Sequence, residues 1–330
     1  MGDSLTNSSG DAGAKNGSSA TPSAFVPGDQ VASRYNIVRL IGSGGTGEVY
    51  EAIDTALGVS VALKALKPSF ASSGVQLERF RREIQNARKV THLNVCRIFD
   101  MGIQNGAGSD RFFLTMELLA GVTLADRIER GARYKPDEAL PIVAQIADGL
   151  DAAHKAGVIH RDLKPGNIML LPPPTGRFAE RAVITDFGLA LSEEQSDMRL
   201  TESDELVGTP EYMAPEQAEP GPATPATDIY ALGLILYEML SKRRPFESAG
   251  TALATVLVRR RSPPRPLREV VPDVPVAWEA AVHRCLEREP ARRFATAGEV
   301  IAALRESPLP GPTGADPGTG FLARLTRKLR

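Results

Sequence analysis

The spacing of apolar residues divides the chain into a strand-rich part followed by a helix-rich part. Between residues 35 and 117, short apolar runs alternate with polar positions and are separated by turn-forming residues, which predicts a series of β-strands. One helix is expected within 78–87, because Phe80, Ile84 and Ala87 fall on one helical face. The segments with strand character are 35–41, 49–53, 59–66, 95–101 and 111–117.

Beyond Gly121 the apolar positions repeat with the period of a helix. Residues 136–156 carry an apolar stripe that includes Ala139, Ile142 and Ile146, which predicts a long helix with one buried face. Residues 229–240 are mostly apolar, but this run is shorter than the roughly 18 residues that a membrane span requires. It is therefore expected to be a buried helix. The remaining expected elements are a strand pair, 168–171 with 182–185, and two closing helices, 278–286 and 297–304.

Both ends of the chain differ in composition from its middle. Residues 1–33 are rich in Ser, Gly, Ala, Asn and Asp, so little apolar burial can offset the entropy of ordering them, and a disordered tail is expected. Residues 307–320 form a Pro/Gly linker. In 321–330 the apolar residues fall on one helical face among basic residues, a pattern typical of a short helix on an anionic membrane surface. A plain solvated tail is an equal alternative.

Composition narrows the class of protein. A chain of 330 residues is long enough for two lobes, and its net charge of −1 argues against nucleic acid as a partner. The two cysteines, Cys96 and Cys285, lie far apart in the sequence and are expected to be reduced thiols. No basic region followed by an apolar run occurs at the N-terminus, so we expect a cytoplasmic protein or the cytoplasmic portion of a membrane-anchored one.

One loop carries the residue types that phosphoryl transfer needs. It reads His160-Arg161-Asp162-Leu163-Lys164-Pro165-Gly166-Asn167, and Asp186-Phe187-Gly188 and Ala214-Pro215-Glu216 follow downstream. Asp162 can accept the proton of an acceptor hydroxyl, and Lys164 can neutralise charge on the moving phosphoryl group. Asn167 and Asp186 offer oxygen ligands to a metal.

This ordered set resembles the catalytic loop, magnesium-binding loop and substrate-loop anchor of eukaryotic-like (Hanks-type) serine/threonine protein kinases, and most of all the bacterial members. The resemblance extends over about residues 35–304. It implies a bilobal α+β fold, with a β-rich N-lobe carrying one main helix and a mostly helical C-lobe. The expected kinase domain is 34–306, divided into an N-lobe of 34–117 and a C-lobe of 121–306.

The resemblance also assigns the ATP-binding residues. The run Gly42-Ser43-Gly44-Gly45-Thr46-Gly47 leads into a strand, whereas a helix follows the glycines in dinucleotide-binding folds, so a hairpin that covers the phosphates is expected. Lys64 matches the lysine that holds the α- and β-phosphates, and Glu83 matches its anionic partner, with Glu78 as the competitor. The other expected nucleotide contacts are Val49, Ala62, Met116, Glu117, Leu119, Asn167 and Asp186.

Four residues have structural roles by the same resemblance. Thr209 is expected to bond to both Asp162 and Lys164, and together with Lys164-Pro165 it favours a serine/threonine kinase. Asp228 should hold the backbone of the catalytic loop. Glu216 and Arg293 should form a buried ion pair, in which each charge requires the other.

A regulatory switch is expected in the loop that follows Asp186. Thr201 and Ser203 lie where bacterial relatives tend to carry autophosphorylated hydroxyls, and Arg161 is the expected phosphate ligand. Leu191 occupies a place where relatives often supply a second cation, so Arg82 or Arg199 is the alternative source.

These observations predict transfer of the ATP γ-phosphoryl group to serine or threonine hydroxyls of proteins in signalling. Mg2+ is the expected metal, with Mn2+ as an alternative, and a homodimer would serve autophosphorylation between copies. A pseudokinase scaffold is one alternative, although Lys64, Asp162 and Asp186 are all present. A small-molecule kinase of related fold is another, although it would lack the segment 208–216. The proline-rich stretch 172–180 is longer than the family's tight turn and is expected to be a stiff surface loop, with a docking site as the alternative.

Overall fold

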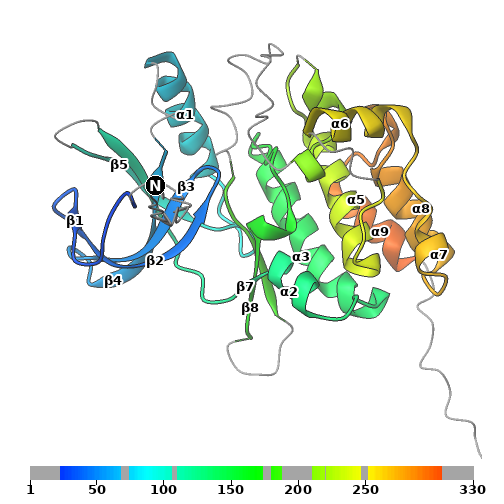
Figure 1. The fold of residues 1–330 in the computed structure, drawn as a ribbon, viewed down its shortest axis with the longest axis horizontal. Helices are drawn as coiled ribbons and strands as arrows, with labels where there is room; N and C mark the ends of the chain where they lie inside the picture. Colours follow the sequence, from blue (N-terminus) through cyan, green and yellow to red (C-terminus); the bar gives the residue numbers. More distant parts are fainter. Residues whose placement is uncertain are drawn as a thin grey trace, which may run out of the picture.

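A computed structural model describes residues 23–67, 74–105, 110–173, 180–187, 210–219, 221–246 and 252–306. Side chains at 74–76, 79, 210 and 252–253 fall outside this description. The molecule has two parts, a sheet with one long helix and a larger helical part (Figure 1). This arrangement agrees with the bilobal α+β fold expected from the sequence.

The N-lobe is built on a six-stranded antiparallel sheet in the order β1-β2-β3-β4-β6-β5. The helix α1 (Gly74–Ala87) packs against it through Phe80 and Ile84, which join Leu114 in one buried cluster. The predicted strands and the one amphipathic helix are thus present, although the strand expected to begin at residue 95 begins at Ile98. The strands are β1 (Gln30–Val31), β2 (Tyr35–Gly44), β3 (Gly47–Asp54), β4 (Val59–Leu66), β5 (Ile98–Gln104) and β6 (Arg111–Met116).

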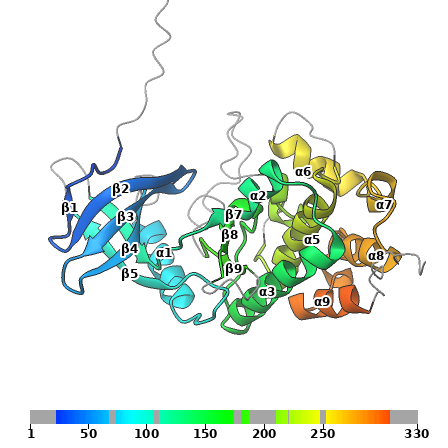
Figure 2. The same ribbon diagram turned by 90° about the horizontal axis from the view of Figure 1, so that it is seen from below.

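The C-lobe is organised around α5 (Pro225–Ser241), the apolar run expected to be a buried helix, and most of its residues are indeed buried. A small antiparallel sheet, β7-β8-β9, lies between the N-lobe sheet and the C-lobe helices (Figure 2). Its strands are β7 (Val122–Thr123), β8 (Ile168–Leu171) and β9 (Arg181–Ile184). The other helices are α2 (Leu124–Arg130), α3 (Pro136–Lys155), α6 (Ala252–Arg261), α7 (Leu267–Val270), α8 (Val276–Cys285) and α9 (Ala297–Arg305). Short 3-10 turns are η2 (Pro165–Asn167), η3 (Pro210–Tyr212), η4 (Pro215–Ala218) and η5 (Pro290–Arg292).

Residues 23–33 correct one expectation. They were expected to belong to a disordered tail, but β1 pairs with β2, and Phe25 and Val31 are buried in the N-lobe core. Residues 1–33 are polar on average, and this average does not reflect the few apolar side chains, such as Phe25 and Val31, that anchor residues 23–33 to the sheet. Residues 1–22 lie outside the described residues.

Several expectations fall on residues that the structure does not describe. They concern Gly188, Leu191, Arg199, Thr201, Ser203, Thr209, residues 174–179 of the proline-rich stretch, and residues 307–330. Within the described ranges, the structure contains no helix long and apolar enough to cross a membrane.

Candidate active site

The catalytic loop joins α3 to η2, and Asp228 at the start of α5 holds its backbone. The two carboxylate oxygens of Asp228 accept hydrogen bonds from the backbone N–H groups of His160 (2.8 Å) and Arg161 (2.9 Å). The ring of His154 lies 2.8 Å from the same carboxylate. Because Asp228 is almost fully buried, these partners compensate for the desolvation of its charge. This is the geometry that the sequence predicted for Asp228.

His160 braces the loop from the other side. Its Nε2 lies 2.8 Å from the carbonyl oxygen of Thr185, and its ring packs against Phe187 with ring centroids 4.6 Å apart. The side chain is fully buried. His160 therefore connects the catalytic loop with the residues on either side of Asp186.

Two residues at this junction have left-handed backbone conformations, with φ of 69° at Arg161 and 64° at Asp186. Such values are uncommon for residues other than glycine and persist where the surroundings fix them. At Arg161, the backbone N–H donates to Asp228 and the carbonyl oxygen accepts from Gln217 Nε2 at 2.9 Å. These two bonds fix the peptide next to Asp162.

Asp162, Lys164 and Asn167 form one hydrogen-bonded group. The ammonium of Lys164 lies 2.7 Å from the Asp162 carboxylate. The amide nitrogen of Asn167 donates to the Asp162 carbonyl at 2.8 Å and to its carboxylate at 3.3 Å. Because the amide nitrogen is engaged in this way, the side-chain oxygen of Asn167 is the atom left to coordinate a cation.

The charged residues of the two lobes are paired differently from the expectation. Lys64 Nζ lies 2.9 Å from Asp186 Oδ2, and only 2% of the Lys64 side chain is exposed. Glu83 Oε1 lies 3.8 Å from Arg161 Nη1. The expected ion pair between Lys64 and Glu83 is therefore not formed in this structure.

The physical reason is competition among four charged groups. A buried ammonium requires a close anionic partner, and Asp186 supplies one to Lys64. The carboxylate of Glu83 instead lies 3.8 Å from the guanidinium of Arg161, which the resemblance had assigned to a phosphate. The sequence identified the four participants but could not distinguish between two ways of pairing them.

The residues expected around the adenine gather where the lobes meet. Ala62 of β4 and Met116 of β6 share a buried cluster with Cys96 and Val183. Val49, Leu118, Leu119, Met169 and Leu171 pack against this cluster. Glu117 donates its backbone N–H to Arg97 O at 2.9 Å, and its side chain pairs with Arg181 at 3.2 Å.

Cys96, Met169 and Val183 were not among the expected site residues. The segments 168–171 and 182–185 were expected to form a strand pair under the active site, but Met169 and Val183 were not singled out as residues that contact the cluster of Ala62 and Met116. Cys96 is also buried there, and burial raises the pKa of its thiol to about 12.

The glycine-rich hairpin connects β2 and β3 at the pair Gly44–Gly47. Gly47 has a φ of +149°, and a side chain there would collide with the backbone carbonyl of Ala65 on β4. Only glycine fits this position, because both the backbone angle and the close approach exclude a Cβ. Gly42, Gly44 and Gly45 have open space around them, so the hairpin tip is accessible to a ligand.

The loop anchor behind the substrate side is a buried ion pair. Arg293 donates to both carboxylate oxygens of Glu216, at 2.7 and 2.8 Å, and to the carbonyl oxygens of Ala226 and Glu287, each at 2.8 Å. Its side chain is fully buried. This two-point geometry is the strong form of an arginine–carboxylate pair, and it joins the partners that the sequence predicted.

Arg259 of α6 is a further residue that sequence reasoning missed. It is buried and donates to the backbone carbonyls of Met213 and of Glu211, the latter at 2.6 Å. Burial lowers its pKa. Val256 and Thr255, three and four residues earlier, are buried on the same helical face, and this spacing is the signal that could have distinguished Arg259 from its exposed neighbours.

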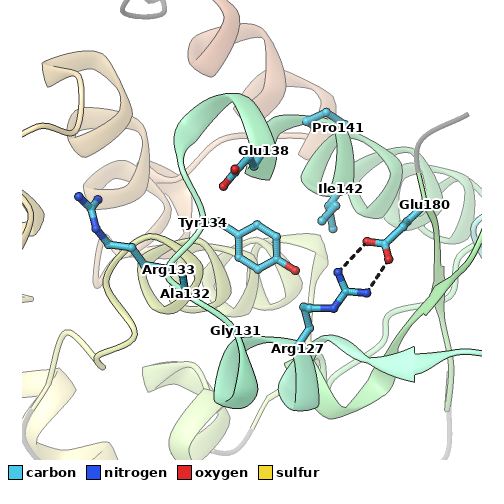
Figure 3. A pocket seen from close by; sticks show the side chains of 9 residues that line it. All are labelled: Arg127, Gly131, Ala132, Arg133, Tyr134, Glu138, Pro141, Ile142 and Glu180. Atoms are coloured by element: carbon cyan, nitrogen blue, oxygen red, sulfur yellow. Dashed lines mark hydrogen bonds and ion pairs between the residues drawn. The ribbon is translucent and has the colours of Figure 1, made fainter.

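A separate surface cavity of about 410 Å3 lies at the ends of α2 and α3 (Figure 3). The ring of Tyr134 lies between the walls, and Arg127 donates two hydrogen bonds to Glu180. None of the predicted site residues lines this cavity, so it is distinct from the site described above. Its lining residues are Arg127, Gly131, Ala132, Arg133, Tyr134, Glu138, Pro141, Ile142 and Glu180.

Comparisons with known proteins identify the family to which the chain belongs. Residues 35–303 match the family described as "Protein kinase domain". The chain is 36% identical over 300 residues to serine/threonine-protein kinase PknA of Mycobacterium tuberculosis, covering 90% of this chain and 67% of PknA. It is 34% identical over 278 residues to serine/threonine-protein kinase PrkC of Bacillus subtilis, covering 84% of this chain and 41% of PrkC.

A crystal structure of the Mycobacterium tuberculosis PknI kinase domain superimposes with a TM-score of 0.66 at 27% identity, covering 86% of this chain and 99% of that domain. The chain belongs to the protein kinase family. It is a serine/threonine protein kinase of the bacterial PknA, PknB and PrkC type. Kinases of this family use ATP and a divalent metal and act on proteins.

Proposed function

We propose that Asp162 orients and deprotonates the acceptor hydroxyl, while Lys164 stabilises negative charge on the transferred phosphoryl group. These roles are supported by the hydrogen bonds and ion pair that join Asp162, Lys164 and Asn167. Asp228 holds the backbone of the loop that carries these three residues. Fixed geometry matters because positioning and electrostatics supply most of the acceleration in phosphoryl transfer.

Asn167 and Asp186 are the proposed metal ligands. The Asn167 side-chain oxygen is left for coordination, and the Asp186 carboxylate is 27% exposed, so both present oxygen atoms of the kind that Mg2+ prefers. Mg2+ commonly binds through one or two protein oxygens together with substrate phosphates, so a larger ligand cluster is not required. When bound, the metal would neutralise phosphate charge, and Mn2+ is the alternative ion.

Lys64 and the hairpin of Gly42, Ser43, Gly44, Gly45, Thr46 and Gly47 are the proposed phosphate-binding elements. The adenine would lie against the apolar cluster that includes Ala62 and Met116, with Val49 and Leu119 beside it. Backbone groups of Glu117 and Leu119 would bind its polar edge. The close backbone approach at Gly47 supports this assignment, because it keeps the hairpin adjacent to the strand that carries Lys64.

The pairing of Lys64 with Asp186, and of Arg161 with Glu83, suggests how activity is regulated. In the proposed active form Lys64 pairs with Glu83, and Asp186 is then available to the metal. A phosphate on Thr201, with Ser203 as the second acceptor, would attract Arg161 away from Glu83 and favour this exchange. Thr209 would complete the loop by bonding to Asp162 and Lys164.

The wider role is proposed by analogy. Autophosphorylation between two copies of the chain would make kinase activity depend on dimerisation. The kinase would act in signalling in the cytoplasm. Residues 321–330 would bind weakly to an anionic membrane surface through their basic side chains.

Mass-spectrometric phosphosite mapping after incubation with Mg-ATP tests these proposals. We expect phosphothreonine at Thr201 and a smaller amount of phosphoserine at Ser203. The Thr201→Ala/Ser203→Ala variant should lose most activity toward a protein acceptor, and Arg161→Ala should reduce the gain that phosphorylation brings. Full activity in the double alanine variant would contradict the regulatory proposal without affecting the assignment of Asp162.

A further inference from the structure

The segment just before the family-matched region packs on β3, next to the base of the glycine-rich hairpin. Residues 23–33 precede the match at 35–303, yet Phe25 is only 7% exposed and belongs to the N-lobe core. Its ring packs edge-on against the Tyr50 ring, with centroids 5.7 Å apart. The guanidinium of Arg111 lies over the Phe25 ring, 5.7 Å from its centroid, and donates to the Ala24 carbonyl.

A polar cluster accompanies this apolar anchor. Glu48 Oε2 accepts hydrogen bonds from the backbone N–H of Ala24 at 2.7 Å and from the Tyr50 hydroxyl at 2.5 Å. The Tyr50 oxygen in turn accepts from the backbone N–H of Phe25 at 3.0 Å. Two backbone donors of the N-terminal segment are therefore bound by two side chains of β3.

These side chains are located where the hairpin leaves the sheet. Glu48 directly follows Gly47 and pairs with Ser43 across the hairpin and with Ala65 on β4. The next residue, Val49, pairs with Lys64. Any contact that fixes Glu48 thus also fixes the base of the hairpin relative to Lys64. The tip has open space around Gly42, Gly44 and Gly45, so its position depends on how this base is held.

We infer that Ala24 and Phe25 act as a brace that positions the glycine-rich hairpin for nucleotide binding, with Glu48 and Tyr50 as the positioning residues that receive it. This inference rests on the proposed role of the hairpin as the phosphate cover. The brace contacts no nucleotide itself. Its effect is to reduce the range of hairpin positions before ATP binds, so that less freedom is lost on binding. A sequence segment outside the matched kinase domain thereby contributes to ATP affinity.

The full-length Phe25→Ala variant tests the brace, with Val26→Ala as the matched control because Val26 is 55% exposed on the same segment. We expect Phe25→Ala, which removes the ring contact with Tyr50 but keeps the backbone N–H, to raise the KM for ATP roughly threefold to tenfold, the range that corresponds to the loss of one edge-to-face aromatic contact, with kcat changed by less than about twofold. Val26→Ala should leave both constants unchanged. Equal KM values for the two variants would overturn the inference.

Hydrogen exchange without nucleotide gives a second readout that does not depend on catalysis. Amides of residues 42–50 should exchange faster in Phe25→Ala than in Val26→Ala, while those of α5 should be unchanged. Glu48→Gln keeps an oxygen acceptor for Ala24 and should raise the KM less than Glu48→Ala. If the unaltered protein transferred no phosphoryl group from ATP, the proposed function would fail, whereas unchanged exchange at residues 42–50 in Phe25→Ala would overturn the brace alone.

Discussion

Removing the charge of Arg293 should strongly destabilise the C-lobe. The Arg293→Met variant keeps much of the side-chain volume but removes two hydrogen bonds to Glu216 and those to the carbonyls of Ala226 and Glu287. Among the described residues, Glu216, which is largely buried, would then keep as a side-chain partner only the hydroxyl of Thr227, at 3.1 Å. Breaking one side of a buried ion pair costs about 3–5 kcal/mol, so we expect a loss of this size in the free energy of unfolding.

The neighbouring Arg292 provides a matched control. It pairs with Glu289 at 2.8 Å, but both side chains are about two-thirds exposed, at 66% and 65%. Exposed pairs contribute about 0–1 kcal/mol, so Arg292→Met should have little effect. The difference in unfolding free energy between the two variants therefore reports the effect of burial on the ion pair, because both arginines lie in the same short segment and each pairs with a carboxylate.

Equilibrium urea unfolding measures this difference. The single tryptophan, Trp278, is buried in the C-lobe core and reports its unfolding by fluorescence, while circular dichroism reports the whole chain. Coincident transitions in both signals would support a two-state analysis. We expect Arg293→Met to lower the urea midpoint without a large change in slope, and Glu216→Gln/Arg293→Met to cost less than the sum of the single variants. A cost for Arg293→Met no greater than that for Arg292→Met would refute the reasoning.

Three further predictions follow from burial and charge. Burial raises the pKa of both Cys96 and Cys285 to about 12, so neither thiol should react with a disulfide reagent at pH 8 until urea unfolds the protein; rapid reaction of the folded protein would contradict this. Burial and the hydrogen bond to Glu48 raise the pKa of Tyr50 to about 12, so the stabilisation by its neutral phenol is complete below about pH 10 and is lost as the pH rises toward 12. Between pH 10 and 12, the free energy of unfolding, measured by urea unfolding at each pH, should therefore fall less in Tyr50→Phe than in the unaltered protein. Equal decreases would contradict the raised pKa of Tyr50. Deleting 321–330 should abolish weak, salt-sensitive co-sedimentation with anionic vesicles, and unchanged binding would remove the membrane proposal.

The sequence predicted those features that depend on local pattern or on a single possible partner. Alternating apolar residues predicted the strands, and the apolar run at 229–240 predicted the buried helix α5. The resemblance paired Arg293 with Glu216, and the structure contains this pair, with the Arg293 side chain fully buried and donating to both carboxylate oxygens of Glu216.

Features that depend on competition between distant groups could not be predicted in this way. Four charges around Lys64 can be satisfied by two different pairings, and only the structure selects one. Arg259 lies among consecutive arginines at the end of α6, where residue type alone does not indicate which one is buried. The burial of Phe25 was not predicted, because a single aromatic residue in a polar segment gives no periodic pattern in the sequence.

The most direct test of the central claim compares Asp162→Asn with the unaltered protein in phosphoryl transfer from γ-labelled ATP to a protein acceptor. The exchange removes the carboxylate that is proposed to accept the hydroxyl proton but preserves the shape of the side chain. We expect the turnover number to fall by at least about a hundredfold while ATP affinity, measured by direct binding, changes by less than about twofold. Asp137→Asn, at an exposed position in the first turn of α3, should leave both quantities unchanged. Near-normal transfer by Asp162→Asn would contradict the proposed mechanism.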